Sequence, residues 1–373
     1  MALRTPAVNR TWLLAGMASL LAAPVDAQDT IPPPSIPTAR VVTASRVTMP
    51  GPVDSNTPLA WSLVEGQWQL TAVVSWGGIP GIAVGPQLEA LPATEPVVIH
   101  NHPGHGIWIE SVIEDEAGTW YGYFHHETPA DDCGRPDRQI PRIGALRSTD
   151  RGRTWTHLGL ILEAPSDSLA CSSTNRFVMG GVGDVSAVLD HDRQYVYLYF
   201  TQYARESAAQ GVAVARMPWA GRDEPVGQFA IWREGVWQPA RRTNPDEEEA
   251  PPRWEYAVGM PLVAAAKPWH DGNSAADAFW GPSLHWNTSI EQWVMLVNRA
   301  RDETFNQDGI YVSFSPRLDD PTAWSAPKEL LNGGGWYGQV VGLEPGEGSD
   351  HLAGRRARLF VTGRSDYVIE FER

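Results

Sequence analysis

A short strand pattern recurs five times along this chain of 373 residues and constrains its fold more than any other feature. Each copy starts with a short opening strand, and in four of the five a turn and a strand rich in aromatic and β-branched residues follow. The openings are Asp54-Ser55-Asn56-Thr57-Pro58-Leu59, Glu110-Ser111-Val112-Ile113, Asp184-Val185-Ser186-Ala187-Val188, Gly281-Pro282-Ser283-Leu284 and Gly338-Gln339-Val340-Val341. Repeated antiparallel sheets of this kind are typical of an arrangement around an axis. The sequence therefore predicts an all-β fold, a five-bladed β-propeller.

The expected blades cover approximately 52–100, 106–165, 180–240, 278–331 and 335–373. How the ring closes is left open by the pattern. Either the first blade takes its outer strand from Arg40–Val47, or N-terminal residues pair with the last blade.

Residues 148–155 carry the most specific motif in the chain, because they match the Asp-box pattern S-x-D-x-G-x-T-W. In such a hairpin we expect Asp150 to cap backbone N–H groups, Gly152 to adopt a φ that other residues avoid, and Trp155 to pack beneath. The motif falls between the third and fourth strands of the second blade. It faces away from the strand openings, so we interpret it as structural.

The N-terminal segment has the features of an export signal. Arg4 and Arg10 precede an apolar run from Trp12 to Ala22, which ends near a small-x-small cleavage pattern at Ala27. The run is shorter than the ~20 residues that a membrane-spanning helix needs. We predict a signal peptide at 1–27 and one domain at 28–373, exported to the periplasm or the extracellular space, with no membrane association after cleavage.

Charge and composition narrow the partners. The formal net charge is -15 and the pI is about 5.1, which argues against binding to nucleic acid or to an anionic membrane. The 17 tryptophans have two interpretations: packing between blades, expected for most of them, or flat rings that stack on sugars. Cys133 and Cys171 both follow the signal, so an oxidising compartment would allow a disulfide, although the sequence leaves open whether they meet.

The propeller geometry predicts which residues share a site. The first residues of the inner strands converge around the axis, so Asp54, Glu110 and Asp184 should meet on one face. One such acid alone would be explained as the cap of a turn. Three from consecutive blades indicate a catalytic cluster, because close like charges raise one another's pKa and keep one carboxyl protonated.

A second ring of side chains should surround this cluster and bind substrate. It comes mainly from the ends of the second strands and from the fourth and fifth openings: Trp76, His126, Glu127, Tyr203, Trp280, Arg299, Gln339 and Arg364. Arg299 and Arg364 suit a carboxylated sugar, or equally a salt bridge to a nearby acid. The histidines around the second blade lack a strong metal-ligand spacing, so no protein-bound metal is predicted.

In these features the chain resembles the five-bladed propeller glycosidases, the superfamily that includes glycoside hydrolase families 43, 32, 68 and 117. Those enzymes take one acid from each of the first three blades, and Asp54-Ser55-Asn56-Thr57-Pro58 is similar to their first-blade motif. The order here is Asp, Glu, Asp rather than the Asp, Asp, Glu of family 43. The Glu-Gly-Pro triplet of that family is matched only by Trp280-Gly281-Pro282, in the fourth blade.

The resemblance implies an O-glycosyl hydrolase acting on an oligo- or polysaccharide. It makes Asp54 the base or nucleophile, Glu110 or Asp184 the acid, and the remaining acid a modulator of pKa. It implies no organic cofactor but allows an axial calcium ion. Three alternatives remain: a non-catalytic carbohydrate-binding propeller, a sialidase-like hydrolase suggested by the Asp box and by Arg142, Arg299 and Arg364, and a uronate lyase using His126, Tyr203 and Arg299.

Overall fold

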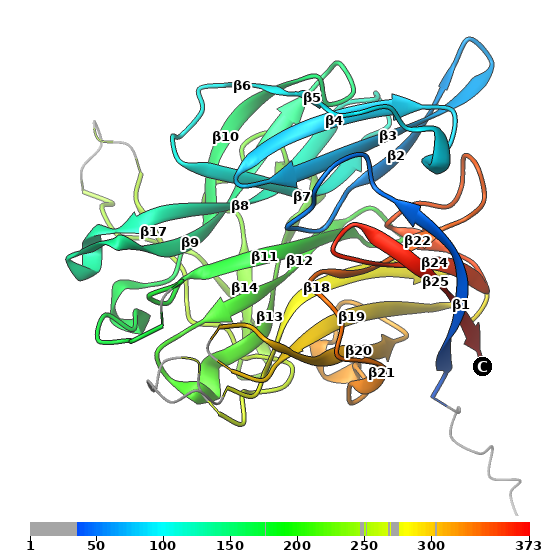
Figure 1. Ribbon diagram of the computed structural model, residues 1–373. Coiled ribbons are helices and arrows are strands. Elements are labelled where there is room, and N and C mark those ends of the chain that lie inside the picture. The colour runs from blue at the N-terminus through cyan, green and yellow to red at the C-terminus, as the bar shows by residue number, and fades with distance from the viewer. Residues whose placement is uncertain are drawn as a thin grey trace, which may run out of the picture. The chain divides into compact units, whose positions relative to one another are not determined.

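The computed structural model describes residues 36–175, 177–246, 250, 252–267, 269, 276–302 and 304–373. The predicted signal peptide at 1–27 lies outside these residues and stays a prediction. Within the described part, strands dominate, and five sheets of four or five strands follow one another around an axis (Figure 1). The five-bladed β-propeller predicted from the repeat is therefore confirmed.

In the first three blades the strands follow one another along the chain from the inner strand outward, except that the outermost strand of blade 2, β6, precedes the inner strand. Blade 1 contains β2 (Leu59–Val64), β3 (Gln67–Trp76), β4 (Ile79–Gly85) and β5 (Glu95–Pro96). Blade 2 contains β7 (Gly106–Glu114), β8 (Trp120–Ala130), β9 (Arg135–Ser148), β10 (Thr154–Leu162) and, at its outer edge, β6 (Val98–His100). Blade 3 contains β11 (Val182–Leu189), β12 (Tyr195–Tyr203), β13 (Gln210–Pro218), β14 (Ala230–Arg233) and β15 (Val236–Pro239).

The last two blades borrow strands from elsewhere in the chain. Blade 4 contains β18 (Ala278–Asn287), β19 (Gln292–Ala300), β20 (Gln307–Ser315), β21 (Lys328–Asn332) and the short β23 (Leu352–Ala353). Blade 5 contains β22 (Gly338–Gly342), β24 (Arg356–Val361), β25 (Arg364–Glu372) and β1 (Thr38–Thr48). A two-stranded ribbon, β16 (Arg241–Arg242) with β17 (Trp254–Glu255), lies in the insertion between blades 3 and 4. The described connections also include short 3₁₀ turns: Leu88–Ala90, Asp131–Cys133, Ser166–Ser168, Ser207–Ala209, Trp219–Gly221 and Pro321–Ala323.

The ring closes through the N-terminal strand. β1 pairs antiparallel with β25, from Thr38 opposite Glu372 to Thr48 opposite Arg364, and the two strands lie side by side in Figure 1. Of the two alternatives that the sequence left open, the second is therefore correct. β6 likewise belongs to blade 2 rather than to the end of blade 1, because it pairs in parallel with β10. Closure gives each large sheet a neighbour on both sides.

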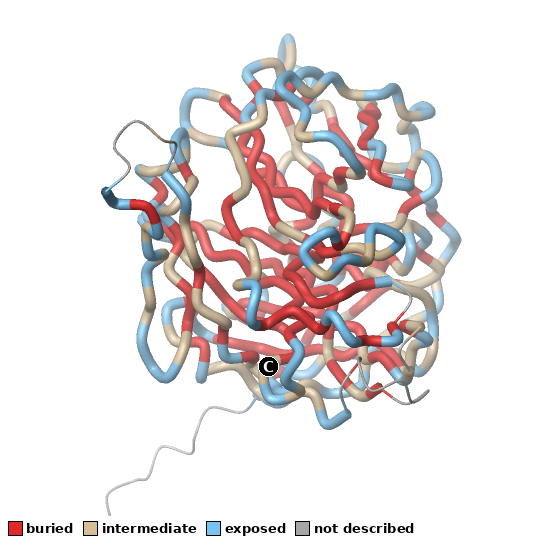
Figure 2. Tube along the Cα trace, turned by 90° about the vertical axis from the view of Figure 1, so that its left-hand side faces the viewer, coloured by how far each residue is buried: buried red, intermediate tan, exposed pale blue. Residues whose placement is uncertain are grey.

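The hydrophobic core consists of layers between neighbouring blades. Val73 and Ile109 share a buried cluster between blades 1 and 2, and Leu296 and Leu359 share one between blades 4 and 5. Figure 2 shows this buried interior beneath exposed loops. Most described tryptophans are buried or half-buried, which fits packing between blades, whereas Trp68 and Trp76 are exposed.

The turn at 148–155 joins β9 to β10, the position predicted for it. The Asp150 carboxylate accepts hydrogen bonds from the Thr154 backbone N–H and hydroxyl at 2.9 and 2.7 Å, and the Trp155 indole N–H donates to the Gly152 carbonyl at 2.9 Å. Gly152 has a φ of +84°. These contacts hold the turn together internally.

Cys133 and Cys171 form a disulfide that joins the tip of the β8–β9 hairpin to the segment that leads into β11. The same segment is bound to β9 by backbone hydrogen bonds from Gln139 N–H to the Phe177 carbonyl and from Met179 N–H to the Gln139 carbonyl. No helix within the described residues has the length and apolarity needed to cross a bilayer.

Candidate active site

Two of the inner strands carry a bulge at their acidic residue. The β7–β8 pairing shifts register between Ile109 and Ser111, which leaves Glu110 outside the ladder, and the β11–β12 pairing shifts between Gly183 and Val185, which leaves Asp184 outside it. Asp184 has a φ of +43°, an uncommon conformation for a residue other than glycine. Bulges redirect side chains and are frequent beside functional sites.

The three predicted acids line one cavity of about 240 Å³. Asp54, Glu110 and Asp184 are joined there by a fourth carboxylate, Glu127, and by His125. The remaining lining residues are aromatic or apolar: Trp108, Phe177, Val178, Tyr203, Trp280, Phe305, Trp336 and Tyr337. Blades 1 to 3 supply the acidic half, while the aromatic half comes from blades 2 to 5 and adjoining loops. The convergence predicted from the strand openings is therefore what the structure contains.

A larger cavity of about 390 Å³ lies between blades 3 and 4, but its described lining is mostly apolar and includes no carboxylate. Val212, Phe279 and Met295 are representative of it. The carboxylates predicted from the strand openings line the smaller cavity.

Asp54 is held at the edge of the cavity by two N–H donors. The Trp108 indole N–H donates to Oδ1 at 2.7 Å, and the Gly77 backbone N–H donates to Oδ2 at 3.0 Å. Burial raises the pKa of Asp54, and these two hydrogen bonds lower it, with a net rise above the ordinary value. Both donors fix the orientation of the carboxylate and favour its ionised form.

Glu110 is more deeply buried than Asp54, with an exposed fraction of 2%. The Val185 backbone N–H donates to its Oε2, which fixes the carboxyl group against blade 3. Burial, and next the neighbouring charge of Asp184, raise the pKa of Glu110 well above its ordinary value. Glu110 is thereby suited to keep a proton at neutral pH.

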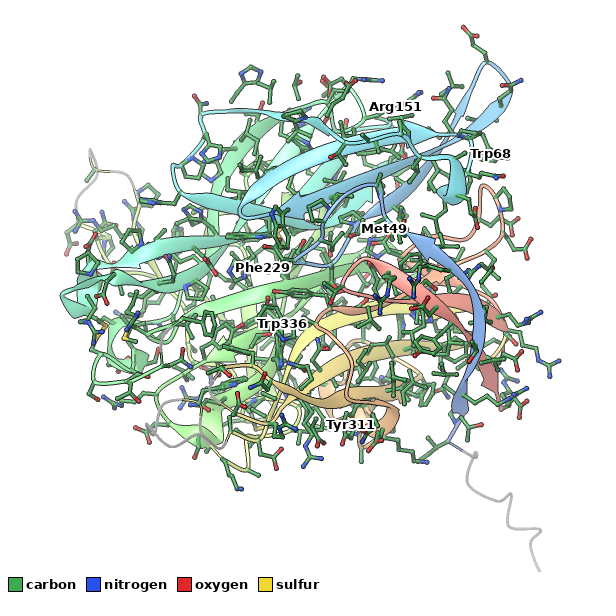
Figure 3. All side chains as sticks on the ribbon, viewed as in Figure 1. Met49, Trp68, Arg151, Phe229, Tyr311 and Trp336 are labelled. Carbon is green, nitrogen blue, oxygen red and sulfur yellow. A yellow bond between two sulfur atoms is a disulfide. The ribbon has the colours of Figure 1, made fainter. Side chains whose placement is uncertain are left out.

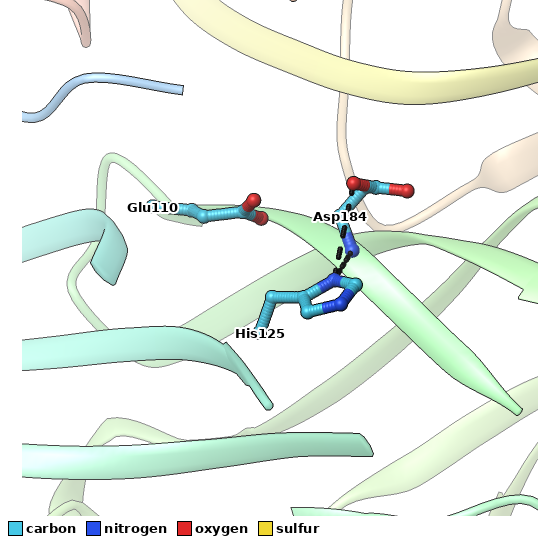
Figure 4. A group of neighbouring side chains, drawn as sticks. All are labelled: Glu110, His125 and Asp184. Atoms are coloured by element: carbon cyan, nitrogen blue, oxygen red, sulfur yellow. Dashed lines mark hydrogen bonds and ion pairs between the residues drawn. The ribbon is translucent and has the colours of Figure 1, made fainter. Parts of the chain in front are cut away.

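Asp184 is fixed by contacts on both its side chain and its backbone. The Tyr203 hydroxyl donates to Oδ2, and the Tyr337 hydroxyl lies 3.3 Å from Oδ1. Its backbone N–H donates to Nδ1 of His125 at 2.8 Å, the contact that Figure 4 draws beside the Glu110 carboxylate. The carboxylate is therefore closely positioned.

His125 lies between carboxylates on both sides. Burial lowers the pKa of His125, but Glu127, Asp184 and Glu110 outweigh it and raise the pKa to about 9. Its Nε2 is 3.5 Å from Glu127 Oε1. Because Nδ1 accepts the Asp184 N–H, the geometry observed is that of a ring protonated on Nε2 alone. A second proton on Nδ1 would face that N–H, so the hydrogen bond opposes the protonation that the surrounding carboxylates favour.

Glu110, His125 and Asp184 also bring one possible metal-ligand atom each to within 4.8 Å of one another. Calcium prefers six to eight oxygen ligands. Here the Nδ1 lone pair accepts a backbone N–H, both Asp184 oxygens have tyrosine hydroxyls beside them, and Glu110 accepts the Val185 N–H. This donor set fits a closed hydrogen-bond network better than an axial calcium ion.

The aromatic half of the cavity is a corner rather than a single platform. Trp280 meets Phe305 at a ring distance of 5.1 Å and Tyr337 at 5.6 Å, with interplanar angles of 71° and 79°. Phe177 packs on Phe305 at 5.7 Å, near the mouth. Rings set nearly at right angles enclose a ligand from two sides.

Three of the predicted substrate-binding residues line the cavity, namely Glu127, Tyr203 and Trp280. His126, Arg299, Gln339 and Arg364 are not brought to it, and each has a structural partner instead. The His126 ring bonds the Gly106 carbonyl at 2.9 Å, and burial lowers its pKa to about 4. Trp76 does not line the cavity, but its neighbour Gly77 binds the carboxylate of the lining residue Asp54.

The two arginines form the salt bridges that were the alternative to sugar binding. Arg299 pairs bidentately with Asp277 at 2.7 and 3.0 Å and also contacts Asp308. Arg364 pairs with Asp366 at 3.1 Å on the exposed β24–β25 hairpin. Neither arginine lines the cavity, so the carboxylated sugar, the sialidase-like triad and the uronate lyase each lose the arginine contact on which they relied.

Gln339 closes the ring rather than facing the cavity. Its amide N–H donates to the Thr57 carbonyl at 2.9 Å, and its amide oxygen accepts the Thr57 N–H at 3.1 Å. The segment just before β22 lines the cavity with Trp336 and with Tyr337, which has a φ of +55°.

Sequence reasoning missed seven lining residues: Trp108, His125, Phe177, Val178, Phe305, Trp336 and Tyr337. For His125 a signal was present. Side chains alternate along a strand, so His125 shares a face with Glu127, and His126 points the other way. The loop residues Phe177 and Phe305 carried no such signal.

No protein-family model matches the chain, and no curated protein matches it. Among solved structures, it is similar to an endo-arabinase from Bacteroides thetaiotaomicron, with 13% identity over 87% of this chain and 96% of that one, and a TM-score of 0.49. It is also similar to a GH93 α-L-arabinofuranosidase of Fusarium graminearum, with 11% identity over 86% of this chain and 79% of that one, and a TM-score of 0.47. An exo-β-1,3-galactanase from Phanerochaete chrysosporium has 9% identity over 88% of this chain and 64% of that one, and a TM-score of 0.48. At this level of similarity, function has to be argued from the cavity itself.

Proposed function

We propose that this chain is an exported glycoside hydrolase whose reaction takes place in the axial cavity. The observation that supports it best is the arrangement of the acids. Asp54, Glu110 and Asp184 line one small cavity, and they differ in environment as a proton donor and a charged partner must. Export is inferred from the N-terminal pattern and agrees with the disulfide, which is typical of oxidising compartments.

The environments assign the roles. Glu110, buried and favoured in its protonated form, is the general acid that protonates the leaving oxygen. Asp54, which accepts two N–H bonds at the cavity edge, is the base that activates water or the nucleophile that attacks the sugar. The negative charge of Asp184 beside Glu110 favours the protonated form of that acid, and His125 in turn contacts Asp184.

The aromatic corner gives the sugar its place. Hexoses and pentoses have carbon-bound hydrogens on one face, and such a face packs on Trp280 or Phe305 while the hydroxyl groups point to the carboxylates. The cavity, at about 240 Å³, is smaller than most ligand sites, which measure about 300–1,000 Å³. It therefore suits one sugar unit better than several.

The test is a screen for hydrolysis followed by matched variants. The purified protein is incubated with 4-nitrophenyl glycosides of pentoses and hexoses, and with soluble arabinan and β-1,3-galactan, and released nitrophenol and reducing ends are measured. Glu110→Gln and Asp54→Asn should each lower kcat on the cleaved substrate by at least about 10²-fold, the scale of general acid–base catalysis. Asp137→Asn, at an exposed residue of β9, should leave kcat unchanged.

A carbohydrate-binding propeller without turnover is the competing function, favoured by the same aromatic corner. It predicts that the protein binds these glycans without releasing products. Trp280→Ala should then lose binding, whereas Glu110→Gln should retain it. If Asp54→Asn, Glu110→Gln and Asp184→Asn all retain full turnover on a cleaved substrate, the catalytic assignment is wrong.

A further inference from the structure

The β3–β4 hairpin of blade 1 presents two large apolar side chains to solvent. Trp76 is 53% exposed and Ile79 is 68% exposed. They are cross-strand partners on either side of the turn, so their side chains lie on the same face of the hairpin. Gathered exposed apolar side chains mark interaction sites more often than single ones do.

Trp76 lies between Ser75 and Gly77, both of which form backbone hydrogen bonds with Asp54. The Asp54 backbone N–H donates to the Ser75 carbonyl at 3.2 Å, and the Gly77 N–H donates to the Asp54 carboxylate at 3.0 Å. The backbone of Trp76 is therefore fixed beside the carboxylate at the cavity edge.

The turn itself is rigid and packed on the cavity wall. Gly77 and Gly78 have φ values of +58° and +75°, as a two-residue hairpin turn of the primed type requires. A Cβ on Gly78 would lie 2.4 Å from the Gly106 Cα and 3.2 Å from the Trp108 ring, so no larger residue fits there. Trp108 lines the cavity and donates to Asp54, so hairpin, wall and carboxylate form one unit.

We propose that Trp76, flanked by Ile79, is a stacking platform for a second sugar unit, the one joined to the sugar held in the cavity. This inference rests on the proposed function. A cavity of about 240 Å³ leaves a neighbouring sugar outside it, and the exposed indole of Trp76, whose neighbour Gly77 binds the Asp54 carboxylate, offers that sugar a flat apolar face. The class of substrate is then an oligo- or polysaccharide rather than a glycoside with a small leaving group.

Blade 1 contains a matched control. Trp68 lies near the other end of the same strand, β3, and is 44% exposed. It packs edge-on against Trp61 at a ring distance of 6.5 Å, at the far side of the blade from the β3–β4 turn (Figure 3). Trp68→Ala therefore removes an equally exposed indole from the same strand without touching the hairpin at Asp54.

The experiment compares two substrates of the same sugar, the 4-nitrophenyl monoglycoside and the corresponding trisaccharide, taken from whichever glycan the unaltered protein cleaves. Trp76→Ala should lower kcat/KM for the trisaccharide about tenfold more than for the monoglycoside, which corresponds to about 1.4 kcal/mol. Trp76→Phe, which keeps a flat ring, should recover part of that ratio. Trp68→Ala should leave the ratio unchanged.

Equal losses on both substrates in Trp76→Ala, or the same ratio in Trp76→Ala and Trp68→Ala, would overturn the platform while leaving the hydrolase assignment intact. If no glycoside is cleaved, migration in native gels containing soluble arabinan or β-1,3-galactan decides separately. The platform predicts retardation of the unaltered protein that Trp76→Ala loses and Trp68→Ala keeps. No retardation of the unaltered protein would also overturn it.

Discussion

Glu110 is the residue at which burial and function conflict most directly. Its folded-state pKa is raised by burial and by Asp184, so the fold favours the protonated form of the carboxyl group over the ionised form. A group of this kind contributes its full stability below its unfolded pKa, about 4.3 for glutamate, and loses it as the pH rises through the folded pKa. The unaltered protein should therefore lose stability at neutral and alkaline pH through this one side chain.

We predict that Glu110→Gln raises the free energy of unfolding increasingly as the pH rises from 4 to 8, by about 1.4 kcal/mol per unit of pKa shift removed. The glutamine amide oxygen still accepts the Val185 N–H but never ionises. Urea unfolding at several pH values measures the difference, with Glu65→Gln at an exposed turn as the control. A difference that is constant with pH would contradict a protonated Glu110.

The two tyrosines on Asp184 allow a second comparison. Tyr203→Phe leaves a buried carboxylate oxygen without its donor and should cost about 1–3 kcal/mol of stability. It should lower kcat more than it raises KM, because Asp184 acts by positioning. Tyr337→Phe removes a longer contact of 3.3 Å and should have the smaller effect on both quantities. The reverse order, measured by urea unfolding and steady-state kinetics, would argue against this placement of Asp184.

At the scale of elements, the disulfide connects the β8–β9 hairpin to the segment that carries Phe177 and Val178 to the cavity mouth. The cysteines are 38 residues apart in sequence. Closing a loop of that length lowers the entropy of the unfolded chain and so stabilises the folded state by about 4 kcal/mol. Replacing both cysteines by serine should lower the urea midpoint accordingly. Adding a reductant to the unaltered protein should reproduce the loss, and an unchanged midpoint in both experiments would show that the bridge does not constrain the unfolded chain.

The same elements show what the sequence allowed and what it did not. The inner strands were recognisable because their β-branched and aromatic residues are local signals. Asp54, Glu110 and Asp184 were predicted to open these strands, whereas Asp54 precedes β2 and the other two lie inside β7 and β11. Choosing His126 with Glu127 overlooked the alternation of side chains along β8. Phe177 and Phe305 come from connections, where position depends on contacts between distant segments. Arg299 was ambiguous because its partner Asp277 lies on another element.

At the scale of the whole molecule, ring closure is the feature with the longest range. β1 pairs with β25 more than 300 residues away, and Val41 packs on the core between blades 4 and 5. The sequence left open whether residues 40–47 complete the first blade or N-terminal residues pair with the last blade. Without β1, blade 5 has an open edge and an uncovered apolar face, which is a site for aggregation.

A circular permutant separates the strand from its position in the chain. Because Thr38 lies opposite Glu372, a short glycine-rich linker from Arg373 to Thr38 can make β25 and β1 a hairpin in a chain that starts at Met49. We predict that this permutant folds with a melting temperature close to that of a chain starting at Ile36, since every strand pair is kept. A chain starting at Met49 without the added strand should be insoluble or lose the cooperative transition. If the truncated chain melts like the others, closure by β1 adds little to stability, and the interfaces between blades must suffice to hold the ring.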